Sequence, residues 1–510
     1  MADMGMGTSI QSPPPGQAVV GGHADPNAQP NGVEDSTQDG EQQQEAASPT
    51  KRYTYQYRTL QGYFLQDDPS TDAATFDFMA PDVNFGLIDR AYESDGSLPN
   101  NGQEMTQWQR FEHHVRSLNQ NAEDNDNDDD NNNNNNNEAQ GDGADKKQQR
   151  QRQRQRLRRH SSHSAPRTRY LVFFLGRHGN GYHNIAERYY GSTAWDCHFS
   201  ALDGDPDGVM IWSDAALSRE GKRQARQVNT FWKNQTSGQG NSPKMRAPDV
   251  YLVSPLDRAL ETAQLSFDGV GSTAAQQREA TFRPVVMEKA REGTGIHTCD
   301  RRGSVSSIRA RYPSYDVDAD AHLTERDEFW TPDRREPNSA LDKRLRSFFD
   351  DLMSNAEILG PEKESVSVTS HSGAIAAMLR VLGHREFGLG TGAVIPVLVK
   401  VRRISLDDDD NDDEDLGRRN GGSGEGAHHK EPTLDLPDLS DNQEDHLDNE
   451  ASSSPSTVDP DDRSKWATIP SCPADLDLTT VGQKRWGMGL KEFLDGVEGG
   501  TLDVEAVPFH

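Results

Sequence analysis

The sequence predicts an α/β fold, a three-layer α/β/α sandwich built on a mostly parallel sheet. Short unbroken apolar runs, typical of strands buried on both faces, recur from residue 167 onward. Segments with helical periodicity alternate with them, and each is long enough to return the chain for a parallel pairing. Helices would therefore cover both faces of the sheet.

The first expected strand is the apolar and aromatic run at residues 170–175, which ends at Gly176. Later segments with a similar strand pattern are expected at residues 249–253, 283–287, 365–370 and 394–401. Pro396 lies in the last of them. Because proline cannot donate a ladder hydrogen bond, we expect that strand at an edge of the sheet.

Helices are expected between and after these strands, with apolar residues at helical spacing. Ser218 is the expected N-cap of the second one. The five helical ranges are 183–190, 217–232, 255–267, 341–352 and 373–382.

Composition divides the chain of 510 residues into six parts, because only 32% of it is apolar and the mean hydropathy is −0.91. Stretches without apolar content cannot bury enough surface to fold, and they carry most of the net charge of −29. We expect a disordered tail (1–50), an extension that packs on the core (51–118), a disordered Asn/Asp and Gln/Arg linker (119–165), the core (166–404), a disordered acidic insertion (405–463) and a C-terminal segment (464–510).

The cysteines Cys197, Cys299 and Cys472 are too few and too scattered for a disulfide framework or a zinc site. This favours a reducing compartment. The amino terminus lacks a signal-peptide pattern, and no apolar run is long enough to span a membrane. The expected location is the cytoplasm, with the nucleus as an alternative, and no membrane partner is expected.

A basic run at residues 146–159 could bind nucleic acid or act as a nuclear import signal. The alternative is a solvated charged linker beside an acidic one, which is the more common use of such runs. We favour the linker and expect no nucleic-acid partner.

Basic side chains recur just after the expected strands. Arg177 and His178 follow the first strand, Arg258 comes a few residues after the second, and His371 follows the fourth. Several cations at one edge of a sheet require an anion, and a phosphate dianion suits them. Glu292 adds a carboxylate, so the set contains a nucleophile, anion ligands and an acid for phosphoryl transfer.

The segment RHGNGYHN, with Arg177, His178 and Gly179 at its start, resembles the histidine phosphatase (phosphoglycerate mutase-like) superfamily, in its fungal branch of probable phosphatases. The resemblance covers residues 53–118 and 167–404. It implies that His178 is phosphorylated, that Glu292 is the proton donor, and that phosphate is bound by Arg177, Arg258 and His371. Asn184 is expected either to contact phosphate or to cap a helix.

One departure from the family pattern concerns the two residues after the motif. Many members carry Glu or Gln and then Ser or Thr, whereas this chain has Asn180 and Gly181. This favours hydrolysis of a small phosphomonoester, with no metal and no cofactor. A mutase-type phosphotransferase and an inactive phosphate- or protein-binding module are the alternatives. Neither the substrate nor the oligomeric state is predicted.

Further side chains have more than one interpretation. Glu288 could replace Glu292 as the acid. Three arginines could extend the pocket or be surface charges: Arg301, Arg302 and Arg309. Four residues could suggest a metal site, but their spacing fits no ligand pattern: His183, His198, His297 and Cys299.

Overall fold

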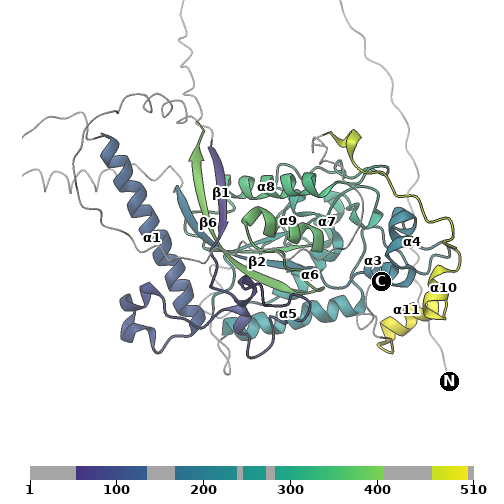
Figure 1. Cartoon of the computed structure of the whole chain (residues 1–510), viewed down its shortest axis with the longest axis horizontal. Helices are drawn as coiled ribbons and strands as arrows, with labels where there is room; N and C mark the ends of the chain where they lie inside the picture. The colour runs from purple at the N-terminus through teal and green to yellow at the C-terminus, as the bar shows by residue number, and fades with distance from the viewer. Residues whose placement is uncertain (1–52, 135–166, 238–244, 272–281, 407–461, 503–510) are drawn as a thin grey trace, which may run out of the picture. The chain divides into compact units, whose positions relative to one another are not determined.

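The computed structural model describes residues 53–134, 167–237, 245–271, 282–406 and 462–502 (Figure 1). They all belong to one compact unit, Lys51–His510. The expected tail, most of the expected linker and almost all of the acidic insertion lie outside the described residues.

A six-stranded sheet in the order β1-β6-β2-β5-β3-β4 forms the centre of this unit. Strands β2, β5, β3 and β4 run parallel, and β6 is antiparallel to both β1 and β2. The predicted α/β fold with a mostly parallel sheet is confirmed. The strands are β1 (Tyr53–Thr59), β2 (Thr168–Arg177), β3 (Val250–Val253), β4 (Val285–Val286), β5 (Ser365–Ser370) and β6 (Val394–Ser405).

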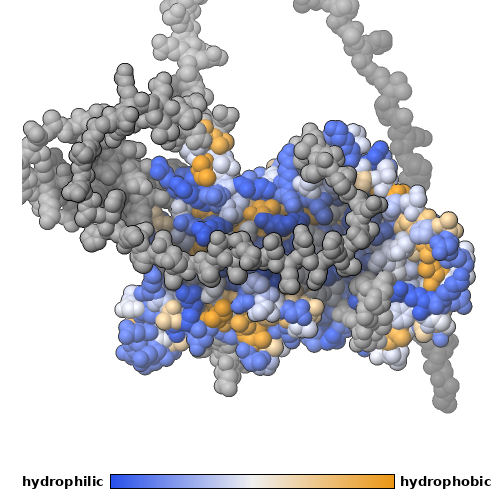
Figure 2. All heavy atoms as spheres, in the orientation of Figure 1, coloured by the Kyte–Doolittle hydropathy of each residue, from blue (hydrophilic) through white to orange (hydrophobic). Residues whose placement is uncertain are grey.

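Helices cover both faces, because residues of β2 alternate between two apolar clusters. Phe173 points to the side covered by α8 and α9, and Phe174 points to the side covered by α1, α5 and α6. The helices are α1 (Gln107–Asn134), α3 (Tyr182–Tyr190), α4 (Ser192–Cys197), α5 (Arg219–Ser237), α6 (Asp257–Phe267), α7 (Val305–Arg311), α8 (Asn338–Ser354), α9 (Ser372–Leu382), α10 (Val481–Trp486) and α11 (Leu490–Gly499). The described surface visible in Figure 2 is largely hydrophilic, with scattered hydrophobic patches.

The expected position of the last strand is wrong. β6 lies between β1 and β2 rather than at an edge. Pro396 pairs with Phe174 at a position that falls between ladder hydrogen bonds, so its missing N–H points away from β2. On the other side the pairing with β1 has already ended at Val399. The strand therefore tolerates proline inside the sheet.

The start of the linker also differs, since α1 continues past residue 118 to Asn134. Asn119 explains the continuation at its beginning. Its Nδ2 donates to Tyr170 O at 3.0 Å, and its Oδ1 accepts from Tyr170 N at 2.7 Å. Ala122, one turn later, is buried. The polar composition had hidden these contacts with β2.

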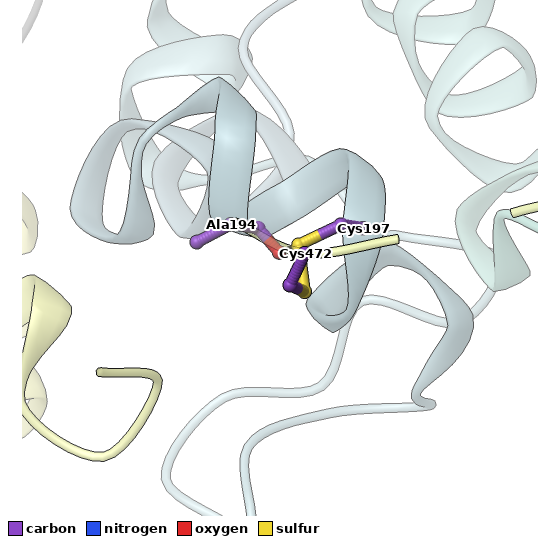
Figure 3. Close-up of a disulfide and its surroundings, with 3 residues drawn as sticks. All are labelled: Ala194, Cys197 and Cys472. Atoms are coloured by element: carbon purple, nitrogen blue, oxygen red, sulfur yellow. Dashed lines mark hydrogen bonds between the residues drawn. A yellow bond between two sulfur atoms is a disulfide. The ribbon is translucent and has the colours of Figure 1, made fainter. Parts of the chain in front are cut away.

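The C-terminal segment is joined to the core by a disulfide between Cys197 and Cys472 (Figure 3). The sequence interpretation did not anticipate it, because a pairing across 275 residues depends on the fold and not on spacing. Phe493 of α11 is fully buried against Tyr189 of α3. No helix in the described ranges is long and apolar enough to cross a membrane.

The extension is expected to be essential for stability, because Phe85 is fully buried against Phe174 of β2 and Trp232 of α5. Phe85→Ala should lower the free energy of unfolding by about 3–5 kcal/mol, since it leaves a cavity between the extension and the sheet. Urea unfolding of the full chain measures this. Leu65→Ala, at a residue 37% exposed in the same extension, should change it little. Equal effects of the two substitutions would contradict the packing.

Candidate active site

The candidate site lies at the carboxyl edge of the parallel strands, where ligands bind in open α/β sheets. His178 directly follows β2 and His371 directly follows β5, and their ring centroids are 5.0 Å apart. Arg258, in the first turn of α6, places Nε 3.3 Å from His178 Nε2. The structure thus brings together three of the residues predicted from the sequence.

His178 is held in one orientation. Its Nδ1 lies 2.7 Å from the carbonyl oxygen of Gly179, and because a carbonyl only accepts, Nδ1 donates and carries the ring proton. The lone pair is therefore on Nε2, beside Arg258. Burial, followed by Arg258 and Arg177, lowers the pKa of His178 well below its ordinary value. The imidazole is consequently neutral and nucleophilic near neutral pH.

Arg258 is almost completely buried and is fixed by the segment 299–300. Its Nη1 donates to Cys299 O at 2.6 Å, and its Nη2 donates to Asp300 Oδ1 at 2.8 Å. Asp300 also pairs with Arg335 at 2.8 Å. Burial opposes ionisation of Asp300, but Arg335 and Arg258 outweigh it and lower its pKa to about 2. This carboxylate orients the arginine for a ligand.

His371 is fully buried and precedes the first turn of α9. Its Nε2 lies 2.7 Å from Ser254 Oγ, whereas Nδ1 finds no hydrogen-bond partner in the described part of the chain. Burial and the neighbouring Arg258 lower its pKa well below the ordinary value. The expected charged state of His371 therefore does not hold for the ligand-free protein, and Nδ1 is left for a ligand.

Arg177 and Asn184 lie on either side of the glycine-rich turn. Arg177, the last residue of β2, donates from Nη1 to Leu389 O at 2.7 Å. Asn184 Oδ1 accepts from Gly181 N at 3.0 Å, which closes the first turn of α3. Of its two expected roles, Asn184 takes the helix-capping one here, and its side-chain amide remains a donor.

Glu292 approaches the same edge from the loop after β4. Its Oε2 accepts from Gly373 N in the first turn of α9, at 2.9 Å, and its Oε1 accepts from Gly293 N at 3.0 Å. A Cβ at position 373 would lie 2.5 Å from Glu292 Oε1. Gly373 therefore makes room for the carboxylate next to His371.

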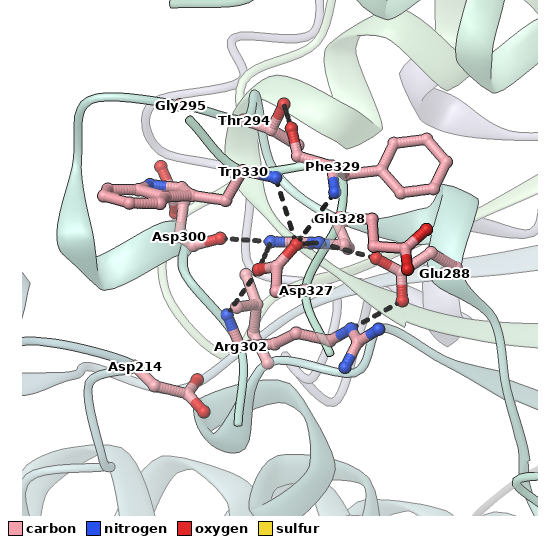
Figure 4. Close-up of polar contacts among 12 residues, drawn as sticks. Asp214, Glu288, Thr294, Gly295, Asp300, Arg302, Asp327, Glu328, Phe329 and Trp330 are labelled. Carbon is pink, nitrogen blue, oxygen red and sulfur yellow. Dashed lines mark hydrogen bonds and ion pairs between the residues drawn. The ribbon is translucent and has the colours of Figure 1, made fainter. Parts of the chain in front are cut away.

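Glu288, the alternative acid, is fully committed elsewhere. It is buried and bonded to two arginines, Arg291 Nη1 at 2.6 Å and Arg302 Nε at 2.7 Å. Arg291 also pairs with Asp327 at 2.7 Å. Figure 4 shows Glu288, Arg302 and Asp327 in this network. Since Arg291 directly precedes Glu292, the network fixes the backbone that carries the carboxylate.

The remaining candidates lie outside the cluster. Arg302 belongs to the Glu288 network, Arg301 pairs with Asp203 at 2.6 Å, and the exposed Arg309 pairs with Asp318. A group of three side chains in the described ranges places donor atoms within 4.8 Å of one another: His297, Cys299 and Asp300. The arginines bound to Asp300 would repel a cation there.

Sequence reasoning missed three residues around the site. Asp300 and Ser254 fix Arg258 and His371 through contacts made only in the folded chain, at sequence separations of 42 and 117. His183 was considered only as a metal ligand, yet its ring centroid lies 5.3 Å from that of His178. Its position inside RHGNGYHN was the one available signal.

Comparison with known proteins gives matches along most of the described chain. The family model of the histidine phosphatase superfamily (branch 1) matches residues 205–411, a range that contains Arg258, Glu292 and His371 but begins after His178. A probable phosphoglycerate mutase from Arthroderma benhamiae is 40% identical over 345 residues, which cover 68% of this chain and 84% of that protein.

Two yeast proteins are also similar. The "Phosphomutase-like protein 3" of Candida albicans is 32% identical over 46% of this chain and 67% of its own length. The "Probable phosphoglycerate mutase PMU1" of Saccharomyces cerevisiae is 34% identical over 47% of this chain and 83% of its own length. Together with the family match and the resemblance around His178, these similarities show that the chain belongs to the fungal branch of the histidine phosphatase superfamily.

Proposed function

We propose that this protein is a metal-independent phosphomonoester hydrolase that works through a phosphohistidine at His178. The observation that carries the proposal is the orientation of this imidazole. Gly179 O holds the protonated Nδ1, so the Nε2 lone pair meets the guanidinium of Arg258. A phosphoryl group placed between them would face a neutral nucleophile and a cation.

In the first step His178 Nε2 attacks phosphorus, and an N–P bond forms as the P–O bond to the alcohol breaks. Glu292, as a carboxylic acid, donates its proton to the departing alkoxide. Four residues hold the phosphoryl oxygens: Arg177, Arg258, His371 and Asn184. Positive charge and donors placed around these oxygens stabilise the charge that spreads over them in the transition state.

In the second step water replaces the alcohol. The Glu292 carboxylate takes a proton from water as the oxygen attacks phosphorus, the N–P bond breaks, and inorganic phosphate leaves. His178 returns to its neutral form. The backbone donors on Glu292, from Gly293 and Gly373, keep the carboxylate in place for both steps.

Transfer to a second substrate position, as in a mutase, is the alternative, and the names of the fungal relatives favour it. The glycine-rich Asn180-Gly181 sequence favours water as the acceptor. The proposed substrate is a small phosphorylated molecule. A cytoplasmic or nuclear location stays a prediction, and the Cys197–Cys472 disulfide weighs against it because such bonds persist mainly in oxidising compartments.

The first test measures phosphate release from p-nitrophenyl phosphate and a panel of phosphomonoesters in excess EDTA. His178→Ala should lower kcat by about a thousandfold or more, because it removes the nucleophile. His322→Ala, at a half-exposed histidine outside the site, is the matched control and should behave as wild type. Interconversion of phosphoglycerates without net phosphate release would instead support the mutase. Inactivity of the wild type in both assays would favour the binding module.

Glu292→Gln separates the two steps. Because p-nitrophenolate leaves without a proton, the variant should release about one equivalent of nitrophenol in a burst and then turn over about 10²–10⁴-fold more slowly. Rapid-quench kinetics and phosphohistidine detection by mass spectrometry measure this. Glu357→Gln, at an exposed glutamate, is the control. Unchanged steady-state turnover of Glu292→Gln would remove this residue from the mechanism.

The pH profile follows from the lowered pKa of His178 in the free enzyme. Since the neutral form is the nucleophile, kcat/KM should stay constant as pH falls through 6.5, the ordinary pKa of histidine, and decline only at lower pH. The profile must be corrected for ionisation of the substrate phosphate. An acidic limb centred at or above pH 6.5 would show that His178 is not desolvated as described.

A further inference from the structure

His183 is the second residue of α3, and its ring turns back over the segment that carries the nucleophile. Side chains on a helix lean towards its N-terminus. The ring consequently packs on Gly181, where a Cβ would lie only 2.7 Å from His183 Nδ1. The bond from Gly181 N to Asn184 fixes this first turn. The chain therefore holds the His183 imidazole beside His178 and away from bulk solvent.

The charges around His183 leave a place for an anion. Burial lowers its pKa well below the ordinary value, and four neighbouring groups lower it further, in the order Arg258, His178, Arg177 and His297. All four are bases. A bound anion would relieve their mutual repulsion and favour a donor on the imidazole.

A buried nitrogen of this ring has no hydrogen bond. Within the described residues, His183 Nδ1 and His371 Nδ1 are both enclosed and without a partner. Both rings lie near His178, with centroids at 5.3 and 5.0 Å. Unsatisfied buried polar atoms destabilise a fold, so a pair of them at one site indicates a missing ligand.

We propose that His183 is a further phosphate-binding residue, whose imidazole donates a hydrogen bond to an oxygen of the phosphoryl group that His178 receives. This inference rests on the proposed function, because it adds a donor to the same pocket. The ligands are phosphomonoesters and inorganic phosphate. His183 contributes from α3, whereas Arg258 and His371 contribute from α6 and the start of α9.

The test is calorimetric titration of the full-length protein with inorganic phosphate. His183→Ala should weaken binding about 10- to 100-fold, the usual effect of losing a hydrogen bond to a charged group. His183→Asn and His183→Gln place an amide donor near the positions of Nδ1 and Nε2, and one of them should restore most of the affinity. His198→Ala, at a histidine on the next helix, should bind phosphate as wild type does.

Wild-type affinity in a folded His183→Ala variant would overturn the inference, as would failure of both amide variants to improve on alanine. If the alanine variant does not fold, the wild-type protein with ¹⁵N-labelled histidine decides the question. Phosphate should then shift the ring nitrogen resonances of His183, and their constancy at saturation would overturn the inference.

The two proposals fail in different ways. Phosphate binding that depends on His183, without turnover of any phosphomonoester, would retain the binding residue and reject the hydrolase. Turnover that depends on His178, with kcat/KM and phosphate affinity unchanged in His183→Ala, would retain the hydrolase and reject the binding residue.

Discussion

The parallel pairing of β2 with β5 is the constraint on which the site depends. Its register sets Arg177 opposite Ser370, and His178 N then donates to Ser370 O at 3.0 Å. The residues that follow the two strands must therefore lie side by side, so the rings of His178 and His371 meet. The apolar residues of β2, packed between the two helical layers, hold this register.

Burial gives the bases around His178 their chemical character. Three imidazoles, His178, His183 and His371, are kept neutral by desolvation and by the cation of Arg258. A buried guanidinium needs a partner, and Asp300 provides it without neutralising the surface that faces His178. The protein thus keeps a neutral nucleophile next to a permanent cation. Unpartnered ring nitrogens reduce stability in the free protein and favour an anionic ligand.

Segments far from the motif hold this arrangement in place. The Glu288–Arg291–Arg302 network anchors the loop before Glu292. On the other side, the C-terminal segment packs Phe493 on Tyr189 of α3, the helix that begins next to His183. The disulfide fixes that segment to α4. Loops and a terminal segment of low apolar content therefore position the first turns of the helices around His178.

The sequence by itself determined the α/β class, the five core strands and the predicted cluster of His178, Arg258, His371 and Glu292. Periodicity and a short motif are local properties, and parallel strands bring their carboxyl ends to one edge. The tertiary structure alone decided that Pro396 lies inside the sheet, that Cys197 meets Cys472, and that Asp300 and Ser254 support the site. These features depend on contacts between residues far apart in the chain, and no local pattern encodes such contacts.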